Sequence, residues 1–359
     1  MPESARQLLD RLLEGPYQDT VGPVLDSITA GLDSAKVRRL YRALEREMVT
    51  LRAAGLPLDA TNPALRALTT EIDEQIARLA AAMTSSADNL INRGIEVTRQ
   101  TIPGLAVAYG ADADAVAQVM AGWGVVSADA IKQLVQYTTS PAWTDALLNL
   151  RKSAVQTVNN AIIRGFVGGL NPLTVARQVA ELQAGLTRTQ ANTLLRTTYL
   201  NSYREAPAAN YRANRDVIKR TIRIAALDDR TCPVCVALHG TEIPVGQAVE
   251  SHHQCRCSSV AEMDGIPLDI GPTGEQWFDG LPEARQRAIL GPGKHDLYRT
   301  GQIRLGDLVG RHEDALYGPM LHTVPLKALK TTGGVPGVPS GSAPAVTVAP
   351  PRPPRRDID

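Results

Sequence analysis

The chain has 359 residues, of which 43% are hydrophobic and 21% are charged, and its formal net charge is +1 at pH 7. A chain of this length can bury a core for about two or three domains, and a nearly balanced charge gives no overall attraction to nucleic acid. Aromatic residues make up only 4% of the sequence, which favours packed helices with aliphatic cores over a β-sandwich. No uninterrupted apolar run is long enough for a membrane-spanning helix.

Residues 3–54 show helical periodicity. Between Val37 and Met48 the apolar residues recur at three- or four-residue spacing, which places them on one face of a helix. Arginines lie between them, but acidic residues such as Glu45 are mixed in. We therefore interpret the charged side as a solvated helix face rather than a nucleic-acid site.

A long helix is predicted to begin at Asn62-Pro63, with Asn as the cap and Pro at the first helical position. Its apolar seam extends to about Val97 and favours a helical hairpin or an arm that faces a partner. Shorter Ala-rich helices, broken at Gly122 and Gly124, are expected over 104–138. The seam consists of Leu65, Leu68, Ile72, Ile76, Leu79 and Met83.

Three further helices are predicted after this region. Ser140-Pro141 begins one that ends at Gly168-Gly169, and Asn171-Pro172 begins another that runs through Leu182. Thr187 and Gln190 form a possible capping box for a separate helix that extends past Tyr203.

The pattern then changes to strands. Isoleucines alternate with polar residues in 217–227, which predicts a strand. Thr241 to Val245 and Ser258 to Ala261 are candidates for its partners in a small sheet. Asp228-Asp229 are interpreted as turn residues rather than a catalytic carboxylate pair.

All four cysteines follow this strand closely, as Cys232-x2-Cys235 and Cys255-x-Cys257. Two thiolates on a tight turn, met by a second pair on a short hairpin, can surround one zinc ion. Soft thiolate and imidazole ligands favour zinc over calcium or magnesium. His239, His252 and His253 lie in the same stretch, and any one of them can substitute for a thiolate.

Disulfides and free thiols are the alternatives to a metal site. No charged-then-apolar signal peptide is recognisable before the first helix, so we expect a reducing compartment, in which structural disulfides are rare. We predict a structural Zn²⁺, with a redox-labile or metal-free cluster as the second interpretation and a catalytic metal as the third.

The stretches DDRTCPVCVALHG and HHQCRC resemble the phage Mu F-like minor head proteins, also called the phage head morphogenesis family. The family pattern combines an Asp-x-Arg-Thr-Cys-x2-Cys block with a His-x2-Cys-Arg-Cys block. A similar order of motifs occurs before the cysteines, around Arg196-Thr197, and after them, from Trp277 to Leu305. The matching residues of the two blocks are Asp228 or Asp229, Arg230, Thr231, Cys232, Cys235, His239, Gly240, His252 or His253, Cys255, Arg256 and Cys257.

The resemblance implies a minor capsid protein of a tailed phage that acts in head morphogenesis and associates with the portal vertex during procapsid assembly. It implies the portal protein and the major capsid or scaffolding protein as partners. The expected location is the virion, in the head interior or at the portal vertex, after assembly in the host cytoplasm. Contact with packaged DNA and ejection with it stay open.

The predicted fold is mainly α with a small α+β zinc-knuckle module, in which long helices precede a short β-hairpin region. We divide the chain into an N-terminal helical domain at 1–139 and a Mu F-like domain at 140–315, with its cysteine cluster at 228–260. Residues 324–359 are rich in Pro and Gly and lack hydrophobic periodicity, so we expect a disordered tail.

An enzyme is not expected. The chain has no His-Glu-x2-His and no Gly-x-Ser-x-Gly motif, and no His-x-Glu precedes the cysteines. The alternatives are a metal-dependent nuclease that uses His252 or His253 and a zinc-dependent DNA-binding module. The second is weakened because no concentrated basic stripe lies near the cysteines.

Overall fold

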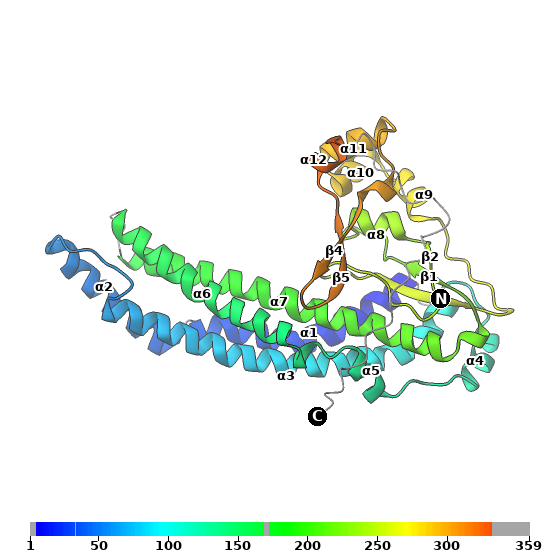
Figure 1. The fold of residues 1–359 in the computed structure, drawn as a ribbon, viewed down its shortest axis with the longest axis horizontal. Coiled ribbons are helices and arrows are strands. Elements are labelled where there is room, and N and C mark those ends of the chain that lie inside the picture. Colours follow the sequence, from blue (N-terminus) through cyan, green and yellow to red (C-terminus); the bar gives the residue numbers. More distant parts are fainter. Residues whose placement is uncertain (1–4, 33, 169–171, 332–359) are drawn as a thin grey trace, which may run out of the picture.

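The computed structural model describes residues 5–32, 34–168 and 172–331. Within these ranges the protein is mainly helical with small antiparallel sheets, as predicted. Long helices run side by side across Figure 1, and a group of short helices and strands lies over one side of α7. The long helices are α1 (Ala5–Leu32), α2 (Ala35–Ala53), α3 (Pro63–Ala108), α6 (Pro141–Val167) and α7 (Pro172–Ala213).

Short elements make up the rest of the described chain. The short helices are α4 (Ala113–Ala121), α5 (Ala128–Leu134), α8 (Pro233–Leu238), α9 (Gly274–Asp279), α10 (Glu283–Leu290), α11 (Pro292–Arg299) and α12 (Leu326–Thr331), with 3-10 turns at Tyr137–Thr139, Arg215–Val217 and Leu305–Leu308. The strands are β1 (Ile218–Ile224), β2 (Glu242–Ile243), β3 (Ser258–Met263), β4 (Val309–Asp314) and β5 (Gly318–Thr323). No helix of the described ranges is long and apolar enough to cross a membrane.

The predicted caps of α3 and α6 are present. Asn62 accepts hydrogen bonds from the backbone N–H groups of Ala64 and Leu65, and Ser140 accepts one from Trp143. The end of α3 was predicted too early, because the helix passes Val97 and Pro103 and continues to Ala108. Its buried stripe continues as well, and tertiary packing of that stripe outweighs the hydrogen bond that a proline removes.

The apolar seam of α3 lies inside the protein. All six seam residues, Leu65 to Met83, are at most 5% exposed and belong to the main core. This core is shared by α1, α2, α3, α6 and α7, so the chain's own helices cover the seam. Of the two predicted alternatives, an arm whose seam faces a partner is therefore wrong.

Helices α3 and α7 approach each other closely at Gly94. A β-carbon at this position would lie 2.8 Å from the Ser202 hydroxyl and 3.2 Å from the Tyr203 backbone nitrogen. A larger residue would push the helices apart, so the glycine sets their separation.

The predicted helix boundary at Thr187 is wrong, because α7 is continuous from Pro172 to Ala213. Gly185 is the weakest helix former between Leu182 and Thr187, and one interior glycine costs only about 1 kcal/mol. The predicted cap residue Asn171 lies outside the described residues.

The three predicted strands form one antiparallel sheet in the order β2-β1-β3. Ile222 pairs with Glu242 on one side and with Val260 on the other, and Ile224 pairs with Ser258. The strand expected over Thr241 to Val245 is shorter, Glu242–Ile243. We call residues 218–263 the cysteine module.

A hairpin and a helix after the cysteine module were not predicted. Strands β4 and β5 form an antiparallel hairpin, in which Asp314 pairs with Gly318. Helix α12 lies within the range expected to be a tail, and its Leu329 is 3% exposed in a small core with Phe278 and Leu308. The expected tail therefore cannot begin before residue 332, and residues 332–359 lie outside the described ranges.

Candidate metal centre

The sheet of the cysteine module brings the two cysteine pairs together. Cys232 caps the N-terminus of α8, where its Sγ accepts a hydrogen bond from the Cys235 N–H at 3.4 Å and Pro233 takes the first helical position. Cys257 directly precedes β3, whose first residue, Ser258, pairs with Ile224 at the end of β1. The β1–β3 register thus places the second pair beside the turn that carries the first.

Five donor atoms gather at this place, and we call the five residues the Cys/His cluster. His252 Nε2 lies 3.0 Å from Cys232 Sγ and 3.2 Å from Cys235 Sγ. Cys235 Sγ lies 3.7 Å from Cys255 Sγ, and these two sulfurs form a second close group with Cys257. Both groups can hold a metal ion, and Cys235 belongs to both.

The protons of the Cys/His cluster are unevenly shared. Hydrogen bonds from Cys235 and His252 lower the pKa of Cys232 to about 5, and a hydrogen bond from Cys235 lowers the pKa of Cys255 well below its usual range. The contact with Cys232 raises the pKa of Cys235. Burial disfavours protonation of His252, but its contacts with Cys232 and Cys255 outweigh burial and raise its pKa to about 10. The cluster therefore concentrates negative charge where a cation can bind.

His239 and His253 have other contacts. His239 Nδ1 accepts a hydrogen bond from the Ala225 N–H at 2.9 Å, and burial together with the charge of Arg223 lowers its pKa to about 4. The His253 side chain is 47% exposed, with Nε2 3.6 Å from an Asp314 carboxylate oxygen. Of the three candidate histidines, only His252 is among the residues grouped as a possible metal site within the described chain.

Three distances within the cluster are close to those of a tetrahedral zinc ion, while the five donor atoms form two groups of three that share Cys235. Zinc bound by thiolates at about 2.3 Å has sulfur–sulfur edges of about 3.8 Å, close to the 3.7 Å between Cys235 and Cys255. The corresponding sulfur–nitrogen edges are about 3.5 Å, so His252 at 3.0 and 3.2 Å would move by only a few tenths of an ångström.

Arg223 is a second reason to expect a charged centre. Its side chain is 2% exposed, and Nη1 donates to the Glu250 carbonyl at 2.6 Å, whereas Nε and Nη2 have no hydrogen-bond partner in the described structure. A guanidinium is always charged and is costly to bury without compensation. Burial lowers the pKa of Arg223, but the charges of the nearby cysteine sulfurs outweigh burial and raise it.

Sequence reasoning missed Arg223 and Arg204. Arg223 lies at a polar position of an alternating strand, which predicts a solvated side chain, but the last four residues of β1 are all buried. Arg204 is buried on α7, where it donates to the Cys255 carbonyl at 2.7 Å and to the Ser251 hydroxyl at 2.9 Å. No periodicity signals such residues, because both depend on long-range packing.

A polar turn precedes the first cysteine pair. Asp228 accepts hydrogen bonds from the Arg230 N–H at 2.9 Å, the Thr231 hydroxyl at 3.0 Å and the Arg256 guanidinium at 2.5 Å. Burial opposes ionisation of Asp228. The hydrogen bonds that its carboxylate accepts, above all the one from Arg256, outweigh burial and hold the pKa of Asp228 well below its usual range. Arg256, between Cys255 and Cys257, thus ties the second cysteine pair to the turn before the first. Asp229 lies in the same turn, as predicted, and its carboxylate pairs with Arg285.

Ion pairs also join the cysteine module to the first helix. Arg230 and Arg256 both contact Asp10 of α1, at 3.5 and 3.4 Å. Arg196 of α7 forms a two-point ion pair with Glu14 of α1. The arginines around the cysteines therefore attach α1 to this side of the protein.

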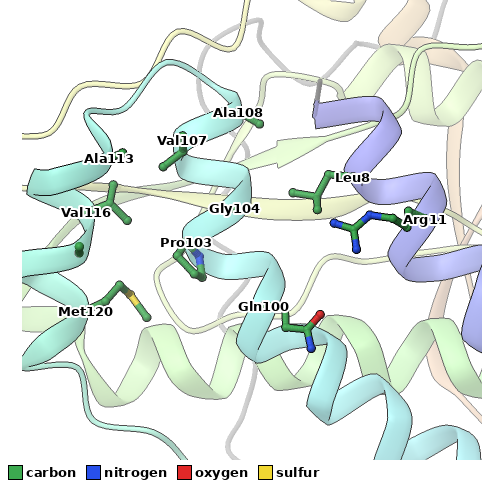
Figure 2. Close-up of a pocket in the computed structure, with 11 residues that line it drawn as sticks. Leu8, Arg11, Gln100, Pro103, Gly104, Val107, Ala108, Ala113, Val116 and Met120 are labelled. Atoms are coloured by element: carbon green, nitrogen blue, oxygen red, sulfur yellow. The ribbon is translucent and has the colours of Figure 1, made fainter. Parts of the chain in front are cut away.

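A separate cavity of about 470 Å³ lies between α1, α3 and α4. Figure 2 shows Leu8 and Arg11 of α1 facing residues of α3 such as Gly104, with Val116 and Met120 contributed by α4. Arg11 is its only ionisable lining residue. The cavity therefore lacks an acid–base pair for catalysis.

Residues 156–260 match the family model described as phage Mu protein F like protein. This part of the chain is similar to the phage Mu F-like family. The match begins within α6, includes α7 and all four cysteines, and ends within β3. It leaves residues 1–155 and 261–359 unmatched, so the predicted domain limits of 140 and 315 are wider than the match. No curated protein and no solved structure matches the chain.

Proposed function

We propose that this protein is a non-enzymatic minor component of a tailed-phage head, in which a structural zinc ion holds the cysteine module together. The observation that carries the proposal is the match of residues 156–260 to the phage Mu F-like family, which implies a role in head morphogenesis. The finer assignment is association with the portal vertex during procapsid assembly, with the major capsid or scaffolding protein as a further partner.

A structural role for the metal is supported by the surroundings of the Cys/His cluster. Cys235, Cys255 and Cys257 are buried, and five protein donors are available for a cation that usually takes four. A catalytic zinc needs a position open to substrate, whereas a structural site is filled by protein ligands. Zinc in such a site contributes folding free energy directly.

A nuclease is less well supported. Such an enzyme would need His252 or His253 to transfer protons beside the metal. His252 Nε2 faces sulfurs of the cluster, and His253 contacts Asp314 and packs edge-on against Tyr317. We therefore prefer the structural interpretation, with contact to packaged DNA as a property that the head role leaves open.

Particle composition tests the head assignment. Heads and procapsids would be purified from infected cells, and the copy number of this protein measured by mass spectrometry against the portal protein. We expect a few copies per particle, retained in procapsids and cross-linked to the portal. A protein found only outside particles at every stage of infection would refute the head assignment.

Metal content tests the zinc assignment with two adjacent, chemically identical substitutions. We expect about one zinc per chain in the purified protein, a lower zinc affinity in His252→Asn, and an unchanged affinity in His253→Asn. His253 is the matched control because its ring lies outside the cluster. Folded wild-type protein without zinc, whose four thiols react freely, would refute the assignment.

A further inference from the structure

The turn that carries His252 has an unusual backbone. Gln254 has a φ of 59°, a left-handed conformation that a residue with a branched-off side chain keeps only where surrounding contacts hold it. The Cys255 N–H donates to the His252 carbonyl at 3.1 Å and closes the turn. Because the turn joins two residues of the Cys/His cluster, its conformation determines how closely His252 and Cys255 approach the first cysteine pair.

One face of α7 carries buried polar side chains that contact this turn. Thr197, Asn201 and Arg204 follow one another at four- and three-residue spacing, so they share a face of the helix. All three residues are at most 8% exposed, and buried polar groups need hydrogen-bond partners. Asn201 accepts hydrogen bonds from Arg204 and, at 3.2 Å, from the hydroxyl of Ser251 in the turn. We call the three residues the α7 polar stripe.

The stripe holds the turn in its middle and at both ends. The Thr197 hydroxyl accepts the backbone N–H of Gln254 at 3.1 Å, at the residue with the left-handed conformation. Arg204 donates from Nη1 to the Cys255 carbonyl at 2.7 Å and from Nη2 to the Ser251 hydroxyl at 2.9 Å. A single guanidinium therefore joins the two ends of the turn, on either side of the candidate ligand histidine.

We propose that Thr197 and Arg204 are positioning residues of the metal centre, which hold the turn in a conformation that brings His252 and Cys255 to the first cysteine pair. In this conformation His252 Nε2 and Cys255 Sγ lie 3.0 and 3.7 Å from sulfurs of that pair. A site whose ligands are already in place loses less free energy to ordering when the metal binds. The inference rests on the proposed zinc site.

Two chemically identical substitutions on α7 test the inference. Thr193 lies one helical turn before Thr197 and accepts a hydrogen bond from the exposed side-chain amide of Gln254 at 2.8 Å, not from the backbone. Zinc affinity of the full chain would be measured in competition with a chelator. We expect Thr197→Val to bind zinc about 10-fold more weakly, as is typical when a group that orients a metal ligand is lost. Thr193→Val should bind as wild type does.

Conservative variants separate the hydrogen bonds from side-chain packing. Thr197→Ser keeps the hydroxyl and should restore the wild-type zinc affinity. Arg204→Lys keeps the buried charge but loses the planar fork that reaches both ends of the turn, so we expect weaker zinc binding. If the lysine variant does not fold, the nearly isosteric Thr197→Val carries the test.

A double-mutant cycle separates positioning from general stabilisation. In a His252→Asn background, Thr197→Val should weaken zinc binding by about threefold or less, because the turn no longer brings a histidine to the metal. General stabilisation of the fold would give the same loss of affinity in both backgrounds.

Three results would overturn the inference while leaving the zinc site intact. They are a wild-type zinc affinity in folded Thr197→Val, an equal loss of affinity in Thr193→Val, and an equal loss with and without His252. Wild-type protein that binds no zinc would instead refute the proposed zinc site, and this inference with it.

Discussion

The ion pair between Arg196 and Glu14 should be one of the stronger polar contacts between α7 and α1. It is a two-point contact, the two side chains are 10% and 24% exposed, and the guanidinium lies 4.9 Å from the centre of the Tyr17 ring. Arg188 and Asp26 join the same helices with a 3.0 Å contact, but their side chains are 44% and 74% exposed. The two pairs therefore differ in burial, in the number of contacts between the charged groups and in the aromatic contact.

We expect Arg196→Met to lower the free energy of unfolding by about 2–4 kcal/mol, because it removes charged hydrogen bonds and a cation–π contact and leaves a partly buried carboxylate. Arg188→Met should cost at most about 1 kcal/mol, as exposed ion pairs do. Urea denaturation followed by circular dichroism would measure both values.

The pH dependence provides a further check. Burial alone would raise the pKa of Glu14, but the bond from Arg196 and the charges of Arg230 and Arg256 lower it. A lowered folded-state pKa stabilises the protein above the unfolded value of 4.5, and the benefit is lost as the pH falls through the folded-state pKa. The difference between wild type and Arg196→Met should therefore shrink below about pH 4.5. Equal destabilisation by the Arg196 and Arg188 substitutions, or a difference that does not change with pH, would refute this reasoning.

Three other predictions concern the long seam, the C-terminal helix and the polar turn. Ile76→Ala should destabilise the isolated protein by about 2–4 kcal/mol, and a wild-type melting curve would show that the seam is not internal packing. Ending the chain at Thr331 should leave the unfolding curve unchanged, whereas Leu329→Asp should destabilise the protein by burying a charge. An equal effect of both changes would contradict the burial of Leu329. Asp228→Asn should loosen the cysteine module at neutral pH, because it weakens the hydrogen bond from Arg256. Amide hydrogen exchange across residues 225–260 should become faster in this variant. Unchanged exchange would contradict the prediction.

Much of the helical fold could be predicted from local signals. Asn62 and Ser140 cap the helices that their sequences indicate, because an N-cap depends on a few neighbouring residues. The C-terminal end of α3 could not be predicted in this way, since buried packing carries the helix past Pro103. The continuity of α7 through Gly185 also had no local signal.

The candidate metal centre could also be predicted in part from the sequence. The spacing of the cysteines indicated one cluster, and the structure brings their sulfurs together with His252. Spacing could not separate His252 from its neighbour His253, because the choice depends on the turn at Gln254, whose backbone N–H donates to Thr197 of α7 at 3.1 Å. The burial of Arg223 could not be predicted for a related reason. Alternation along a strand shows which residues share a face of the sheet, but not whether the second face is covered by other parts of the protein.

Arginines lie beside the cysteines in this sequence, and the structure gives this arrangement a physical meaning. Arg256 separates two cysteines of the cluster and points to Asp228 and Asp10, so one short segment directs sulfurs to one side and positive charge to the other. Arg230 contacts Asp10 and Glu14 in the same way. A metal that fixes the cysteines would therefore also fix the arginines that hold α1. Because α1 also packs along α3 in the main core, the metal would stabilise the contact between the cysteine module and the long helices, well beyond the ligands themselves.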